Sequence, residues 1–219
     1  MPPGYSQGKA EQNVHHWPLP LLNLRSVSIS AEAPVTEHFI RPLLSEYYLL
    51  NTICIFIQMI DDLLNNDTVK QMKNFRQHYE TSCFDHCLIA SYYCYLYGKK
   101  FNLDYVSCAR AAMLHDLFLY DWRKKQDGRK GLHAFTHPKT AYENASKLFD
   151  LNEKEKDIIL KHMWPVTISF PKYKESYLLT LVDKYCALNE SYQEIYNRFC
   201  QKKLFRYAYV FLCVLFIRL

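Results

Sequence analysis

The sequence predicts an all-α protein built around one helical domain, and three observations lead to this fold class. Of the 219 residues only 5 are glycine and 9 are proline, which disfavours a β protein rich in tight turns. Apolar residues recur at helical spacing through most of the chain, and 49% of all residues are hydrophobic. Helix-capping residues stand in front of several of these stretches. The length suits one domain with appendages.

Both ends of the chain differ from this helical middle. Residues 1–36 are rich in Pro, Gly, Ser and Gln, and we expect a partly irregular N-terminal arm without a signal peptide. Residues 199–219 are predicted to form an apolar C-terminal helix that packs on the domain or at an interface. Contact of this segment with a membrane surface is the less favoured alternative. The eight cysteines form no C-x-x-C pair, so we expect a reduced, cytoplasmic protein.

The helical domain is expected to span residues 37–198. Its first helix, over about 37–66, is apolar but shorter than the ~20 uninterrupted apolar residues of a bilayer span. A short helix over 68–77 follows. Ser82 and Asp85 then predict the start of a helix that ends at Gly98, and Asp104 caps another that runs to about residue 119.

A basic loop separates these helices from the last three. The segment DWRKKQDGRKGLHAFTHP, residues 121–138, is long enough to suggest a functional role. Helical patterns resume over about 139–149 and 153–163, where Pro165 stops the second helix. A long helix then covers about 175–198.

Ionisable residues interrupt the apolar faces of four helices: His86, His115, Asp116, His162 and Asp183. Taken singly, each has an ordinary explanation, such as a hydrogen-bonded core histidine or an Asp183–Lys184 ion pair. Taken together, three histidines and two aspartates supply the nitrogen and oxygen ligands of a transition-metal or Mg²⁺ site. Adjacent residues on a helix point about 100° apart, so Asp116 is expected to span two ions while His115 serves one.

The order of these residues resembles the HD-domain superfamily of metal-dependent phosphohydrolases. TSCFDHCLIASY is similar to the family's first-histidine helix, and ARAAMLHDLFLYD to the helix that carries the His-Asp pair. The resemblance covers roughly residues 75–190. It implies an all-α HD domain in which His86, His115, Asp116 and Asp183 hold one metal ion.

The segment HAFTHP extends the resemblance to the binuclear branch of the family. Its His137-Pro138 pair is similar to the His-Pro that supplies a second-metal ligand, so a second ion would use Asp116, His137 and His162. His133 is the alternative ligand from this loop. No GYP motif follows His162, so hydrolysis of cyclic-di-GMP is not implied. One or two divalent ions are expected, and Fe, Mn, Co, Ni, Zn and Mg are not distinguished.

The resemblance implies hydrolysis of a phosphomonoester or phosphodiester, on a nucleotide or another small molecule, with Asp116 as a catalytic residue. Arg123 is the second catalytic candidate, because it follows Asp121-Trp122 directly after the helix of the His-Asp pair. Arg123, Lys124 and Lys161 are the candidate phosphate-binding residues. A net charge of +5 without a concentrated basic stripe gives no reason to expect nucleic-acid binding. The alternatives are an HD-fold di-iron oxygenase and a non-catalytic nucleotide-binding module. Homo-oligomerisation is left open.

Overall fold

The computed structural model describes residues 35–78, 81–124 and 131–201, and most of the predicted N-terminal arm and of the C-terminal segment lies outside these ranges. The chain divides into two compact units, 1–47 and 48–219. Only the first turns of α1 (Val35–Met59) are described in the first unit. Over its described residues the second unit is mostly helical, as predicted, with one small two-stranded hairpin.

The elements that follow α1 in the second unit are short. Two brief helices, α2 (Asp61–Asn65) and α3 (Asp67–Lys70), lead into a 3-10 turn at Gln71–Asn74. Strand β1 (Arg76–His78) then pairs antiparallel with β2 (Thr81–Ser82). The predicted helix over 68–77 was therefore wrong at its end, where the chain becomes extended and places Gln77 beside the later site.

The central pair of helices is α4 (Cys83–Lys100) and α5 (Tyr105–Leu114). Both predicted N-caps are confirmed, because Ser82 accepts from the Asp85 N–H and Asp104 from the Ser107 N–H. Gly98 does not end α4 as predicted but lies inside it. A Cβ there would be 2.9 Å from the Tyr105 Cβ, so glycine permits the close approach of the two helices.

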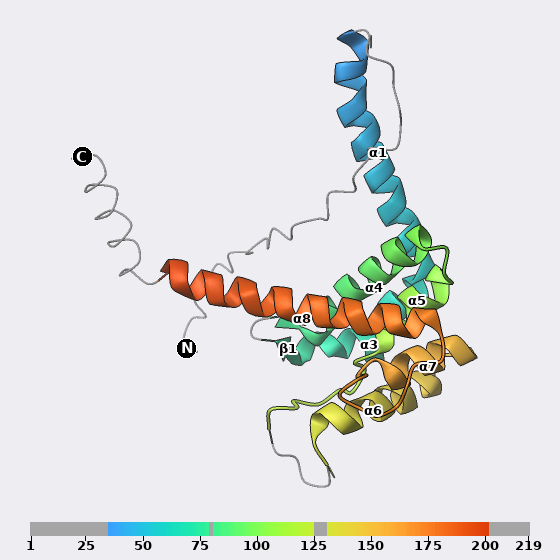
Figure 1. The fold of residues 1–219 in the computed structure, drawn as a ribbon, viewed down its shortest axis with the longest axis vertical. Coiled ribbons are helices and arrows are strands. Elements are labelled where there is room, and N and C mark those ends of the chain that lie inside the picture. The colour runs from blue at the N-terminus through green and yellow to red at the C-terminus, as the bar shows by residue number, and fades with distance from the viewer. Residues whose placement is uncertain (1–34, 79–80, 125–130, 202–219) are drawn as a thin grey trace, which may run out of the picture. The chain divides into compact units, whose positions relative to one another are not determined.

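The remaining helices are α6 (His133–Leu148), α7 (Glu153–Lys161) and α8 (Lys174–Gln201). Helix α8 packs against α4, α5 and α7, while α7 also contacts α5 and α6 (Figure 1). In α5 the fully buried Ala109, Ala111 and Ala112 add little side-chain bulk, and Ser91 Oγ of α4 donates to the Ala109 carbonyl at 2.7 Å. Four helices thus converge on one buried region.

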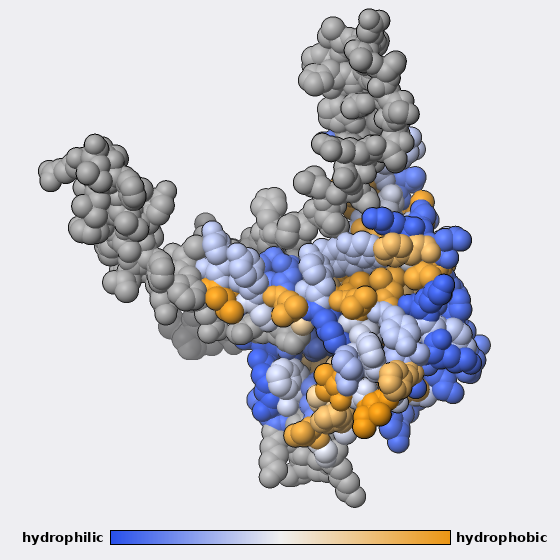
Figure 2. Space-filling view, in the orientation of Figure 1, coloured by the Kyte–Doolittle hydropathy of each residue, from blue (hydrophilic) through white to orange (hydrophobic). Residues whose placement is uncertain are grey.

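Apolar side chains line the outer face of α8. Leu181, Tyr185, Leu188, Tyr192 and Ile195 are all exposed and follow one another at spacings of three and four residues. Apolar groups along this helix are visible in Figure 2. Within the described ranges, no helix has both the length and the apolar character needed to cross a bilayer.

Candidate metal centre

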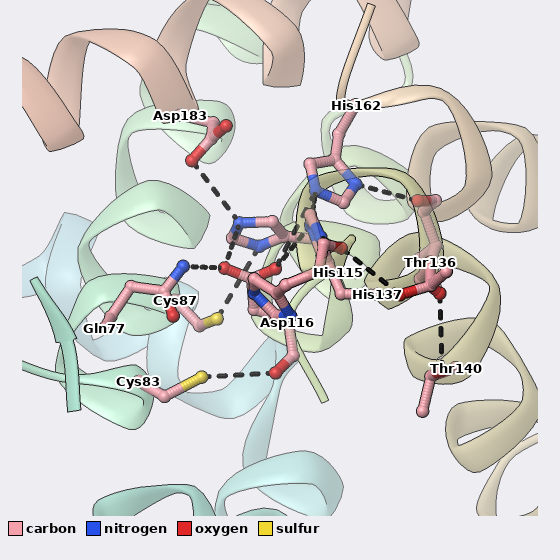
Figure 3. Close-up of polar contacts among 12 residues, drawn as sticks. Gln77, Cys83, Cys87, His115, Asp116, Thr136, His137, Thr140, His162 and Asp183 are labelled. Atoms are coloured by element: carbon pink, nitrogen blue, oxygen red, sulfur yellow. Dashed lines mark hydrogen bonds and ion pairs between the residues drawn. The ribbon is translucent and has the colours of Figure 1, made fainter. Parts of the chain in front are cut away.

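The six predicted metal ligands meet at one place in the fold, although they come from five helices or helix ends. His86 lies on α4, His137 on α6 and Asp183 on α8, whereas His115 and His162 are the residues that cap the C-termini of α5 and α7. Asp183 is partly buried, and the five others are buried. Figure 3 shows most of this set pointing toward a common centre.

The local structure around His115 differs from the expectation. Helix α5 ends at Leu114 instead of continuing to residue 119, so the His115-Asp116 pair lies in the turn that follows. The Phe118 N–H donates to the Asp116 carbonyl at 2.8 Å, and Leu119 has a φ of 53°, in the left-handed region. The pair therefore lies at the end of the helix, where His115 still has helical backbone angles.

Asp116 lies between His115 on one side and His137 with His162 on the other. Its Oδ1 is 3.3 Å from His137 Nε2 and 3.7 Å from His162 Nε2. Its Oδ2 is 3.4 Å from His115 Nε2 and accepts a hydrogen bond from Gln77 Nε2. Oδ2 thus faces His115 and Oδ1 faces His137 and His162. A carboxylate that binds two ions needs its two oxygens to face different ligands in this way.

Backbone carbonyls orient three of the histidine rings. The Nδ1–H groups of His115, His137 and His162 donate to the carbonyls of Ala112, His133 and Ile159 at 2.7, 2.9 and 2.8 Å. This bond fixes the tautomer in which Nε2 carries a lone pair. Metal-binding histidines are usually held in this way by a hydrogen bond from the other ring nitrogen. In each ring that lone pair faces the cluster around Asp116.

The lone pairs of two of these rings face each other. His137 Nε2 and His162 Nε2 are 2.8 Å apart, although both Nδ1 atoms already act as donors. Burial, together with the neighbouring His115 and His137, lowers the pKa of His162 to about 3, so this ring is neutral. Among the described residues, the buried atoms His115 Nε2 and Asp116 Oδ1 have no hydrogen-bond partner. A shared cation would satisfy these acceptors, so the residues fit a metal ion.

His86 lies between two carboxylates. Its Nε2 is 3.1 Å from Asp183 Oδ1, and its Nδ1 is 2.8 Å from Glu190 Oε1. Burial alone would lower the pKa of His86, but hydrogen bonds to Asp183 and Glu190 raise it well above its ordinary value. Glu190 was missed by the sequence reading, although it lies two helical turns after Asp183 and so on the same face of α8.

Asp183 is held by histidines and not by its neighbour in sequence. Its Oδ1 lies 3.1 Å from His86 Nε2 and 3.6 Å from His115 Nε2. Burial works against ionisation of this carboxyl, but the neighbouring imidazoles of His115 and His86 keep its pKa well below the ordinary value. Lys184 instead donates to the carbonyls of His162 and Thr180, at 3.4 and 3.2 Å. The Asp183–Lys184 ion-pair explanation is therefore wrong.

Two cysteines of α4 also adjoin the centre. Cys83 Sγ donates to the Asp116 carbonyl at 3.2 Å, and Cys87 Sγ lies 3.6 Å from His115 Nδ1. Burial raises the pKa of both thiols, which favours the protonated form. Four overlapping groups have ligand atoms within 4.8 Å of one another: Cys83/Cys87/Asp116, His86/His115/Asp116, His115/His162/Asp183 and Asp116/His137/His162. The centre is thus a buried His/Asp/Cys cluster that could hold metal.

A cavity of about 660 Å³ adjoins this cluster. Asp116, His137, His162 and Asp183 contribute to its wall, so the ligand atoms face a space that can admit a small molecule. His133 and Trp122 also line it, with their rings stacked at 5.4 Å and 11°. His133 belongs to none of the four ligand groups, whereas His137 does.

The three predicted phosphate-binding residues form other contacts and do not line this cavity. Arg123 Nε and Lys124 Nζ pair with Asp121, at 3.3 and 3.6 Å, and Lys161 Nζ donates to the Phe170 carbonyl at 3.3 Å. None of the three is among the described residues that line the cavity. Residues 125–130 of the basic segment lie outside the described ranges. The end of that segment, predicted as loop through residue 138, is helical from His133 onward.

Comparison of the chain with protein-family models, curated proteins and solved structures gave no match. The findings therefore amount to an all-helical domain with buried His/Asp clusters that could hold metal, without a family assignment.

Proposed function

We propose that this protein is a metal-dependent phosphohydrolase with a two-ion centre. One observation supports this more than any other: the two carboxylate oxygens of Asp116 face different histidines, His115 on one side and His137 with His162 on the other. The ordered set of ligands that resembles the HD-domain superfamily supports the same function. The cavity beside the centre gives a substrate direct access to it.

The donor set divides into two ion sites that share Asp116. One site would use His86, His115 and Asp183 with Asp116, and the other would use His137 and His162 with Asp116. All of these ligand atoms are nitrogen or oxygen, which suits Mn, Fe, Co, Ni, Zn or Mg. Divalent ions held by these residues would lower the pKa of a bound water and polarise a phosphoryl oxygen.

The protein's own residues prepare this centre. Backbone carbonyls hold three imidazoles in one tautomer, Glu190 orients His86, and the amide of Gln77 holds Asp116. Burial of the cluster excludes bulk water and strengthens the electrostatic interactions within it. These features would hold the metal ligands in place before a substrate binds, as electrostatic catalysis requires.

The proposed substrate is a small phosphate ester, such as a nucleotide. The volume of about 660 Å³ falls in the range of small-molecule sites. Arg123 and Lys124 remain proposed phosphate contacts from the basic segment, since Trp122, next to Arg123, lines the cavity.

The test is a screen of phosphomonoesters and phosphodiesters with protein reconstituted in turn with Mn²⁺, Fe²⁺, Co²⁺ and Mg²⁺. We expect phosphate release that requires metal and is lost in Asp116→Asn, a variant of unchanged side-chain size. Circular dichroism of the variant controls for its fold. Absence of phosphate release with every metal would contradict the proposal. Tightly held iron with O₂ consumption would instead indicate the oxygenase alternative.

A further inference from the structure

Lys184 lines the cavity, whereas Arg123, Lys124 and Lys161, the basic residues predicted to bind phosphate, do not. It lies on α8 directly after the ligand Asp183, is partly buried and lines the cavity. Among the described residues of the cavity wall, it is the single lysine or arginine. This position puts a positive charge beside the metal centre and not at the molecular surface.

The ammonium group of Lys184 has bonding capacity left for a ligand. Its two described acceptors are the carbonyls of His162 and Thr180, at 3.4 and 3.2 Å, whereas an ammonium carries three N–H donors. No carboxylate of the described residues forms an ion pair with it within 4 Å, in contrast to Lys154, which contacts Asp104 and Glu175. The Lys184 ammonium is therefore held by two carbonyls and forms no ion pair within 4 Å among the described residues, although the nearby Asp183 carboxylate attracts it.

The surroundings of Lys184 strengthen its attraction for an anion. Leu132, Met163, Val166 and Ala187 make much of the cavity wall apolar. A charge beside apolar walls is poorly screened by water, so it interacts more strongly with an opposite charge than an exposed lysine does. Arg123 and Lys124, by contrast, are exposed and already paired with Asp121.

We propose that Lys184 binds the phosphate group of the substrate in the cavity, as a point charge beside the ion site that contains Asp183. This inference rests on the proposed function and assigns its main phosphate-binding role to α8 instead of the basic loop. The free N–H of the ammonium would donate to a phosphoryl oxygen. The two carbonyl bonds keep the side chain extended along the wall.

Binding of inorganic phosphate to the metal-reconstituted protein, measured by isothermal titration calorimetry, tests this role without turnover. Lys184→Met should weaken binding by about 10- to 100-fold, the loss typical for a charged hydrogen bond. Lys184→Arg should recover part of it. Lys174→Met is the matched control, because Lys174 is an exposed lysine of the same helix and its replacement should leave phosphate affinity unchanged.

Lys184 also contacts the His162 carbonyl, so its replacement could weaken phosphate binding by disturbing the metal site. Measuring the metal content of the variant distinguishes this effect from loss of a direct phosphate contact. We expect Lys184→Met to retain the wild-type metal content and to raise KM more than it lowers kcat. Unchanged phosphate affinity in Lys184→Met, or parallel loss of metal and phosphate, would overturn the inference while hydrolysis by the wild type still upheld the proposed function. Phosphate binding that depends on Lys184, without hydrolysis of any ester, would uphold the inference and contradict the function.

Discussion

His137 and His162 face each other through their Nε2 atoms at 2.8 Å, while the Nδ1 atom of each ring donates to a backbone carbonyl. Imidazoles in these tautomers present lone pairs to each other, which is unfavourable unless a cation lies between or beside them. Asp116 Oδ1 adds a negative charge 3.3 Å from His137 Nε2. The three groups together form the clearest cation-binding arrangement in the described part of the chain.

Replacing His137 tests which loop histidine is the ligand. His137→Ala should lower the affinity for the second ion by at least about 100-fold, more than the ~10–100-fold typical of a residue that only orients a ligand. His133→Ala is the matched control, since His133 lines the same cavity but belongs to no ligand group. Metal titration followed by calorimetry measures both. The reverse order of effects would assign the site to His133.

Glu190 is expected to act through His86. Its carboxylate lies 2.8 Å from His86 Nδ1, so Glu190→Gln should weaken metal binding by about 10–100-fold without removing a ligand. Glu194→Gln, one turn further along α8, provides a control of the same chemistry. Equal metal affinities in the two variants would show that Glu190 does not orient the histidine.

Gly98 is expected to be required for the packing of α4 against α5. Helix propensity alone predicts that Gly98→Ala stabilises the protein by about 0.5–1 kcal/mol. The added Cβ would lie 2.9 Å from the Tyr105 Cβ and 3.0 Å from its Cα, so we expect a net loss of about 1–3 kcal/mol. Urea unfolding of the variant and of the exposed-site control Lys100→Ala measures the difference. A more stable Gly98→Ala protein would show that the helices can separate freely.

Acid should destabilise the contact between α8 and the start of α5. Burial raises the pKa of Glu175, but hydrogen bonds from the Asp104 N–H and from Lys154 hold it below its ordinary value of 4.5. A lowered folded-state pKa stabilises the fold above the unfolded value, and this contribution disappears as the pH falls through the folded value. The free energies of unfolding of wild type and Glu175→Gln should therefore differ near neutral pH and converge in acid, as the pH falls through a folded-state pKa that lies below 4.5. A constant difference would contradict this assignment.

Most of the site residues could be predicted from the sequence because they are ionisable residues within apolar helical patterns. His86, His115, Asp116, His162 and Asp183 interrupt apolar helical patterns, and such side chains need partners when buried. The structure brings all five together with His137. Glu190 has a sequence signal in its position two turns after Asp183, but its role, like that of Gln77, depends on how α8 and β1 pack beside the other helices.

Local rules failed where packing or a turn decides the structure. Gly98 is a helix-ending residue by propensity, but the approach of Tyr105 explains it instead. The start of α6 has no capping side chain at Leu132, and Pro138 lies inside the helix, so the sequence offered no helical start signal at His133. Lys184 was considered only as a partner of Asp183, because its place on the cavity wall is a property of the fold.

Elemental analysis of protein purified without a histidine tag tests the central claim, that this cluster is a metal centre, most directly. We predict more than one divalent ion per chain in the wild type after reconstitution, and loss of both ions in Asp116→Ala, because Asp116 contributes to both sites. His133→Ala should keep the wild-type content. A wild-type protein that takes up no Mn²⁺, Fe²⁺, Co²⁺, Ni²⁺, Zn²⁺ or Mg²⁺, or an Asp116→Ala protein with unchanged metal content, would contradict the account.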